Sequence, residues 1–308
     1  MNIVIIGPTL LTKACIEEIA KQHNILALFT LDEISGSKKS RYTTFFDQAE
    51  KYNFKIYQVK KVNTPEIISL IKSLNPNLII EAGWSEIIPK EILEIPEKGI
   101  IGIHGAILPD IKGGASMNWA LIRGEEEWGV TLYYLVEKVD EGDIISTKKF
   151  KITLEDDIET VHFKSDLASA ELLKENLHLI EQNKEPRIQQ NPLQGIKLPQ
   201  RKPEDSRINW NKSTLEIYNW IRAQTHPFPG AFTFFKEKKL YIWKAHYEEY
   251  PEREFKPGQI IEINEHGIKV KTLNNSILLK RLNFENEPEQ LAYDFALRNK
   301  LKIGDSFV

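Results

Sequence analysis

Two residues of the kinds that exchange protons stand directly after apolar runs near the middle of the chain. His104 ends the run GIIGIH, and Asp140 follows the apolar run that begins at Val130. In open α/β sheets, sites are built from polar residues delivered at the carboxyl ends of strands. A histidine and a carboxylate brought together in this way can form a general base and the group that orients it. The pattern predicts a catalytic pair of His104 and Asp140, while a structural role for each residue alone stays open.

The segment between these two residues is rich in turn signals. It contains the dipeptide Leu108-Pro109, a Gly113-Gly114 loop and a helical pattern from Met117 to Arg123. Proline and glycine mark places where a chain turns. We therefore expect residues 99–145 to be the stretch around which the site is organised.

The first half of the chain alternates short apolar runs with stretches of helical spacing. This alternation predicts βαβ units, and hence a Rossmann-like, mostly parallel sheet of the α/β class. The expected strands cover residues 2–7, 25–29, 54–59, 78–82, 99–104 and 130–136, and the expected helices cover residues 12–21, 45–52, 65–74, 89–93 and 158–182.

The second half follows a linker. Residues 189–205 hold several prolines and little hydrophobic periodicity, which is typical of a connection between domains. A helix and several short strands separated by turn signals come after it. They predict a small β-barrel resembling an OB fold. We expect a catalytic domain over 1–188, the linker over 189–205 and the barrel over 206–308.

The composition excludes several classes of function. The formal net charge of −3 gives no support to non-specific binding of nucleic acid, which needs basic surface. Cys15 is the single cysteine, and the histidines lack metal-ligand spacing, so no disulfide and no metal are expected. Neither a signal peptide nor a membrane span is visible, which predicts a cytoplasmic protein. The turn after the first strand lacks G-x-G-x-x-G, which argues against NAD, and no P-loop occurs.

Several motifs together resemble the 10-formyltetrahydrofolate-dependent formyltransferases. That family's pattern runs roughly N-x-H-x-S-L-L-P, R-G, G-V-T and D-x-G-x-I, followed by D-x-x-I-D-W and P-W-P-G-A in the C-terminal domain. The matching segments here are GIHGAILP (102–109), KG (112–113), GVT (129–131), DEGDI (140–144), PEDSRINW (203–210), HPFPGA (226–231) and KIGD (302–305). The resemblance covers nearly the whole chain.

The resemblance implies an N-formyltransferase with 10-formyltetrahydrofolate as cosubstrate and no metal. His104 would help remove the proton of the attacking amine, and Asp140 would orient the imidazole. The folate is expected along the loop after residue 80 and beside the residue before Asp140, where Trp84 either packs on the folate or covers the core. The cofactor-binding candidates are Glu81, Ala82, Gly83, Trp84, Ser85 and Val139.

One departure from the family pattern falls inside the site. The asparagine that helps to hold the formyl oxygen in the family is Gly102 here. Losing such a donor costs roughly 3 kcal/mol where it has been tested. A backbone N–H, a water molecule, Ser116 or Asn118 is expected to take its place. The departure also leaves open a non-catalytic binder of folate or sugar nucleotide.

The acceptor substrate is inferred from similarity alone. Residues 117–125 and 200–205 look most like the nucleotide-sugar branch of the family. We therefore expect a UDP-linked 4-amino-4,6-dideoxy sugar from a pseudaminic-acid or aminoarabinose type of pathway. The expected partners are a nucleotide sugar and folate, without nucleic acid or membrane, and methionyl-tRNA formyltransferase is the alternative. The substrate-binding candidates are Lys112, Gly113, Gly114, Ser116, Asn118, Arg201, Lys202 and Arg207.

Overall fold

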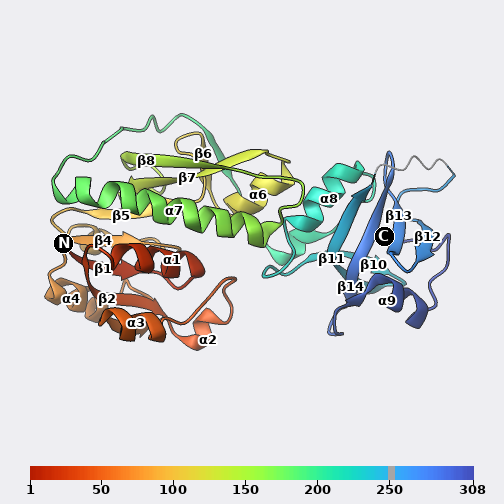
Figure 1. The fold of residues 1–308 in the computed structure, drawn as a ribbon, viewed down its shortest axis with the longest axis horizontal. Helices are drawn as coiled ribbons and strands as arrows, with labels where there is room; N and C mark the ends of the chain where they lie inside the picture. Colours follow the sequence, from red (N-terminus) through yellow and green to blue (C-terminus); the bar gives the residue numbers. More distant parts are fainter. Residues whose placement is uncertain (249–253) are drawn as a thin grey trace. The chain divides into compact units, whose positions relative to one another are not determined.

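The structure, a computed structural model, describes residues 1–248 and 254–308, and these form two compact units (Figure 1). The first unit consists of residues 1–116, 127–151 and 162–198. The second consists of residues 117–126, 152–161 and 199–308. Two segments that come before residue 162 thus belong to the second unit.

The first unit is built on a seven-stranded sheet in the order β3-β2-β1-β4-β5-β7-β8. The first five strands in this order are parallel to one another. β7 pairs antiparallel with β5, and β8 pairs antiparallel with β7. The strands are β1 (Asn2–Ile6), β2 (Asn24–Leu31), β3 (Lys55–Val59), β4 (Leu78–Glu81), β5 (Ile100–His104), β7 (Glu127–Tyr134) and β8 (Ile144–Lys151).

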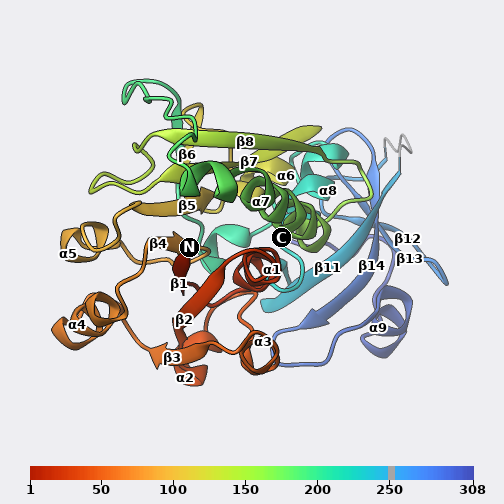
Figure 2. The ribbon, with the colours of Figure 1, turned by 60° about the vertical axis from the view of Figure 1, so that its left-hand side comes forward.

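Helices cover both faces of this sheet. Figure 2 shows α4 and α5 on one face and α1 and α7 on the other. Because both faces are covered, the central strands are apolar throughout, as in β1, where the side chains from Ile3 to Ile6 are fully buried. The helices are α1 (Leu10–Ile19), α2 (Glu33–Gly36), α3 (Phe46–Tyr52), α4 (Pro65–Leu74), α5 (Lys90–Leu93) and α7 (Ile158–Glu181).

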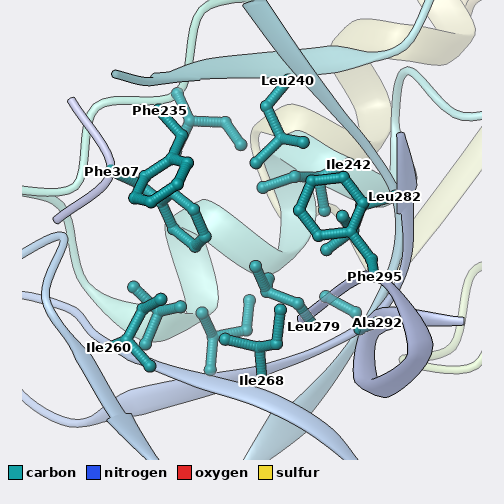
Figure 3. Close-up of a cluster of buried hydrophobic side chains, with 14 of the residues drawn as sticks. Phe235, Leu240, Ile242, Ile260, Ile268, Leu279, Leu282, Ala292, Phe295 and Phe307 are labelled. Atoms are coloured by element: carbon teal, nitrogen blue, oxygen red, sulfur yellow. The ribbon is translucent and has the colours of Figure 1, made fainter. Parts of the chain in front are cut away.

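The second unit joins helices to an antiparallel sheet in the order β10-β11-β14-β13-β12, with β15 paired to β14. Ser213 caps α8 by accepting a hydrogen bond from the Glu216 N–H. Aromatic and aliphatic side chains of the sheet and of α9 point into one core (Figure 3). The elements are α6 (Ser116–Ile122, whose first residue lies in the first unit), η1 (Pro203–Ser206), α8 (Thr214–Arg222), β10 (Ala231–Phe235), β11 (Lys238–Glu248), β12 (Ile260–Asn264), β13 (Gly267–Lys271), β14 (Ser276–Phe284), β15 (Gln290–Leu291) and α9 (Ala292–Arg298).

The predicted fold class is confirmed: a mostly parallel sheet domain is followed by a smaller antiparallel one. A small parallel pair, β6 (Ile111–Gly113) with β9 (Ile196–Leu198), was not expected. It brings the segment predicted as a linker against the turn after His104. Among the described helices, none is both long and apolar enough to cross a membrane. The cytoplasmic address stays a prediction.

Candidate active site

The structure places His104 and Asp140 beside each other. His104 is the last residue of β5, and Asp140 lies in the loop between β7 and β8. The Nδ1 atom of His104 is 3.4 Å from Oδ1 of Asp140, and each side chain is 8% exposed. β7 runs antiparallel to β5 and ends beside the start of that strand, so the loop after β7 must carry Asp140 back to His104.

Two hydrogen bonds and the local backbone conformation fix the carboxylate of Asp140. The backbone N–H of Gly113 donates to Oδ2 at 2.9 Å, and the hydroxyl of Tyr133 donates to Oδ1 at 3.2 Å. The backbone of Asp140 has a φ of 60°, a left-handed conformation that aspartate tolerates better than most residues. The carboxylate is therefore held in one orientation by the chain itself.

Both ring nitrogens of His104 face oxygen atoms. Nε2 lies 3.0 Å from the carbonyl oxygen of Ile111, opposite the contact with Asp140. Burial lowers the pKa of His104 below its usual value, while Asp140 and the Ile111 carbonyl oppose that effect. The neutral ring has one unprotonated nitrogen that can accept a proton. Once protonated, the ring has an acceptor for each N–H, so this pair can take up a proton and hold it.

The turn after His104 is tied to β7. Thr131 donates its hydroxyl to the Ala106 carbonyl at 2.7 Å and accepts the Leu108 N–H at 3.0 Å. Trp128 donates its indole N–H to the Gly105 carbonyl at 2.8 Å. Through these contacts, β7 holds the chain that follows the histidine in place.

The predicted folate loop follows β4 and is fixed by hydrogen bonds to its backbone. Thr12 donates to the Ala82 carbonyl at 2.7 Å, and Lys39 donates to the Gly83 carbonyl at 2.8 Å. Gly83 has a φ of 83°, which a residue with a side chain rarely adopts. Trp84 is 9% exposed and packs in the core of the first unit, whereas Ser85 is exposed.

The loop before Asp140 offers apolar surface to a ligand. Val136 and Val139 are 45% and 56% exposed, which is unusual for valine beside a buried ion pair. An ion pair between Lys90 and Glu137, with nitrogen and oxygen 3.5 Å apart, links this loop to α5. The loops after β4 and β7 thus provide backbone groups and apolar side chains, which suit a flat, partly apolar ring.

Several of the other predicted substrate residues make hydrogen bonds within the protein. Lys112 donates to the Pro192 carbonyl at 3.4 Å, and Gly114 donates its N–H to the Leu198 carbonyl at 3.3 Å. Ser116 begins α6, where Asn118 is buried and donates its side-chain amide to the Ala223 carbonyl at 2.7 Å.

The basic residues of the predicted linker make their contacts within the second unit. Arg201 lies over the rings of Trp119 and Trp220 and donates to the Gln224 side chain at 2.8 Å. The other two predicted residues are exposed, and the Arg207 guanidinium lies over the Phe234 ring. Arg201 is therefore committed to packing rather than free for a diphosphate.

Sequence reasoning missed two parts of this arrangement. Tyr133 lies two residues after Thr131, and this alternation along β7 was the one available signal that both face the site. The contact to the Ile111 carbonyl has no sequence signal because it is made by backbone. In residues 1–248 and 254–308, no cluster of three or more His, Cys, Asp or Glu could hold a metal ion.

Two family models match the sequence. The model described as "Formyl transferase" matches residues 1–177, and "Formyl transferase, C-terminal domain" matches residues 201–300. The chain belongs to the formyl transferase family. The prediction of an N-formyltransferase is confirmed at this level, and so is the formyl donor, because the family takes its formyl group from 10-formyltetrahydrofolate.

Named relatives within the formyl transferase family differ in what they act on. A methionyl-tRNA formyltransferase from Clostridioides difficile is 34% identical over 99% of both chains. HypX from Aquifex aeolicus, solved with tetrahydrofolic acid, is 17% identical with a TM-score of 0.67, covering 99% of this chain and 48% of its own. An N-formyltransferase from Helicobacter canadensis, solved with folinic acid and dTDP-3-aminofucose, is 20% identical with a TM-score of 0.64, covering 90% and 98%.

The expected nucleotide-sugar substrate is wrong. Other curated relatives that match over nearly their full length, at 29–31% identity, are also methionyl-tRNA formyltransferases. The sugar enzymes are similar in fold, at about 20% identity. The expectation that no nucleic acid is a partner is contradicted by the same relatives. The error arose because short segments such as 200–205 decided the substrate, and there Arg201 serves packing in the second unit.

Proposed function

We propose that this formyl transferase moves the formyl group of 10-formyltetrahydrofolate to the α-amino group of methionyl-tRNA. The buried pair of His104 and Asp140, 3.4 Å apart, is the observation that carries the chemistry. The choice of acceptor is supported by the 34% identity to the Clostridioides difficile enzyme over the full length of both chains.

The reaction needs a base for the amine proton and a hydrogen-bond donor for the formyl oxygen. The amine nitrogen attacks the formyl carbon, the bond from that carbon to N10 breaks, and the proton lost by the amine finally resides on N10. Neutral His104 can accept the amine proton because its lowered pKa keeps a ring nitrogen unprotonated at neutral pH. Asp140, fixed by Gly113 and Tyr133, stabilises the imidazolium until the proton is passed on.

The folate would be held mainly by backbone. The loop after β4 is kept in shape by Thr12 and Lys39, and Gly83 permits its turn, since a side chain there would meet Thr9. Exposed Val136 and Val139 would cover the apolar face of that ring. Such a site binds and orients the donor, so that the formyl carbon meets the amine beside His104.

A tRNA acceptor needs basic surface, and the second unit has a candidate. By formal charge the second unit is nearly neutral, because residues 152–161 add four acidic residues to the excess of Lys and Arg after residue 200, so its basic surface is local. A cavity of about 360 Å³ on the antiparallel sheet is lined by Lys244, His246, His266 and Lys280, among others. Cationic side chains around a hollow suit the phosphates of a nucleic acid.

The test is formylation of methionyl-tRNA by the wild-type protein and two variants. Removing the base in His104→Ala, or the orienting charge in Asp140→Asn, should lower kcat by roughly 10²- to 10⁴-fold. His178→Ala, at an exposed histidine of α7, is the matched control and should keep the wild-type rate. Circular dichroism checks that all variants stay folded. Wild-type protein that binds the folate and the tRNA without transferring a formyl group would refute the proposal.

A further inference from the structure

The side-chain position of Gly102 is taken up by its neighbours. A Cβ built on Gly102 would lie 2.3 Å from Cδ1 of Leu135 and 3.3 Å from Oε2 of Glu81. Glu81 is paired with Gly102 in the register of β4 and β5. The space that a larger residue at 102 would fill therefore contains the carboxyl group of Glu81.

Glu81 and His104 lie on the same face of the sheet. Residues paired across neighbouring strands point to one face, and so do residues two apart on a strand. Gly102 is paired with Glu81 on one side and with Tyr133 on the other, and it stands two residues before His104. Side chains from three adjacent strands thus lie on one face of the sheet near the ends of β4 and β5.

The carboxyl of Glu81 is held through one oxygen. Oε1 accepts the Trp84 N–H at 2.5 Å, which turns Oε2 toward Gly102. Gly102 has no side chain to offer there, and the Asn118 amide donates to the Ala223 carbonyl. Tyr133 also lies beside position 102, but its hydroxyl donates to Asp140, which leaves Glu81 as a neighbouring side chain that can donate a hydrogen bond once it is protonated.

The surroundings of Glu81 favour its neutral form. Burial raises the pKa of Glu81 to about 7, and the negative charge of Asp140 adds to this effect. The N–H groups of Trp84 and Gly83 and the ammonium of Lys39 act in the opposite direction. The charge of ionised Glu81 would in turn add to the raised pKa values of Tyr133 and Cys15, which burial raises first.

We propose that protonated Glu81 donates a hydrogen bond from Oε2 to the formyl oxygen as negative charge develops on that oxygen. This inference rests on the proposed formyl transfer. As the amine nitrogen bonds to the formyl carbon, the carbonyl electrons move onto oxygen, and the neutral acid stabilises them without giving up its proton. When the bond to N10 breaks, the carbonyl re-forms. The amine proton passes through His104 to N10. His104 therefore transfers the proton, whereas Glu81 stabilises the charge on the oxygen.

The pH dependence of Glu81→Gln separates a donor from a base. A glutamine amide donates at every pH, whereas Glu81 donates only while it is protonated, below about pH 7. The ratio of kcat/KM in Glu81→Gln to that in the wild type should therefore rise as pH increases from 6 to 9. Titration of the substrate amine cancels in this ratio. Glu81→Ala, which has no donor, should lose roughly 10²- to 10³-fold in kcat.

The control variant is Glu86→Gln, an exposed carboxylate of the same loop that also acts on Lys39. It should leave the pH profile unchanged. If Glu81 were instead the base, Glu81→Gln would be inactive at all pH values, and wild-type activity would rise through pH 7 with this group. That result, or Glu81→Ala with wild-type kcat, overturns the proposal.

A binding measurement without tRNA keeps this inference separate from the proposed function. At pH 6 the wild type should bind 10-formyltetrahydrofolate about fivefold tighter than tetrahydrofolate, as one hydrogen bond of about 1 kcal/mol provides. Glu81→Gln should keep the preference and Glu81→Ala should lose it. If the protein prefers 10-formyltetrahydrofolate over tetrahydrofolate in this way but does not formylate methionyl-tRNA, only the proposed acceptor is wrong. If the wild type is active and Glu81→Ala binds the two folates with the same preference as the wild type, only the proposed role of Glu81 is wrong.

Discussion

At the scale of single residues, neighbours decide what each acid or base can do. Asp140 and Glu81 are carboxyl groups at the same edge of one sheet, yet Asp140 accepts hydrogen bonds from Gly113 and Tyr133 while burial favours the proton on Glu81. The same contrast appears among histidines. His162 on α7 contacts Arg41, and burial together with that positive charge lowers its pKa to about 3.

The buried His162 predicts a loss of stability in acid. Its pKa is about 3 in the folded protein and about 6.5 when unfolded, so the unfolded chain binds the extra proton between these values. The free energy of unfolding should fall by roughly 4 kcal/mol between pH 6.5 and pH 3 through this group alone. His162→Gln should flatten the pH dependence in urea melts, and the exposed His178→Gln should not. Parallel curves for wild type and His162→Gln would contradict this assignment.

Residue-level chemistry was only partly visible in the sequence. His104 could be predicted because it ends an apolar run, which places it at the edge of the sheet. Asp140 also follows an apolar run, but that run is antiparallel to β5, and the loop after it brings the carboxylate back to His104. The contact between Glu81 and position 102 could not be predicted, because it depends on the register of β4 against β5 and on the course of the chain at Leu135. Substrate choice was predicted wrongly because it depended on short segments with no chemistry of their own.

At the scale of elements, long periodic segments were predictable and three-residue strands were not. α4 (Pro65–Leu74) matches its expected bounds because a threonine cap and a first-turn proline mark its start. β6 and β9 are too short for any pattern, yet their pairing shapes the site. Gly113 lies in β6 with a φ of 95°, and a Cβ there would be 2.2 Å from the Leu198 carbonyl oxygen.

Gly113→Ala should therefore damage both stability and activity. The substitution strains the backbone by about 1 kcal/mol, and it also forces β6 from β9 and draws the N–H away from Asp140. We expect a loss of at least about 2 kcal/mol in unfolding free energy and of more than about tenfold in kcat. Gly304→Ala is the control, since Gly304 has a φ of 90° with nothing within 4 Å of its Cβ position. Equal effects of the two substitutions would show that the contact with Leu198 is unimportant.

At the scale of the whole molecule, charge is distributed unevenly along a nearly neutral chain. The formal net charge of −3 gave no sign of a nucleic-acid substrate, because it averages an acidic first part with a basic last part. The cationic cavity of the second unit depends on folding, which gathers Lys244 from β11, Lys280 from β14 and His266 from the turn between β12 and β13. Such a gathering cannot be predicted from composition.

The cationic cavity predicts salt-dependent binding of methionyl-tRNA. Each phosphate contact contributes roughly one to the slope of log K against log salt concentration, so removing two lysines should lower that slope by about two. The variant is Lys244→Ala with Lys280→Ala, measured by filter binding from 50 to 200 mM salt. Lys302→Ala, exposed in the same unit, is the control. A slope equal to that of the wild type would exclude the cavity from the tRNA interface.

The interleaving of the two units has a consequence for how the chain is made. Residues 117–126 and 152–161 emerge from the ribosome long before residues 199–308, with which they form one unit. Asn118 needs the carbonyl of Ala223, and the carbonyl groups of Thr153 and Asp156 receive the guanidinium of Arg222. Until residues 199–308 are synthesised, residues 117–126 and 152–161 lack these partners and remain incompletely folded. Translation order and folding order therefore differ in this protein, and its last hundred residues complete structure that the first half began.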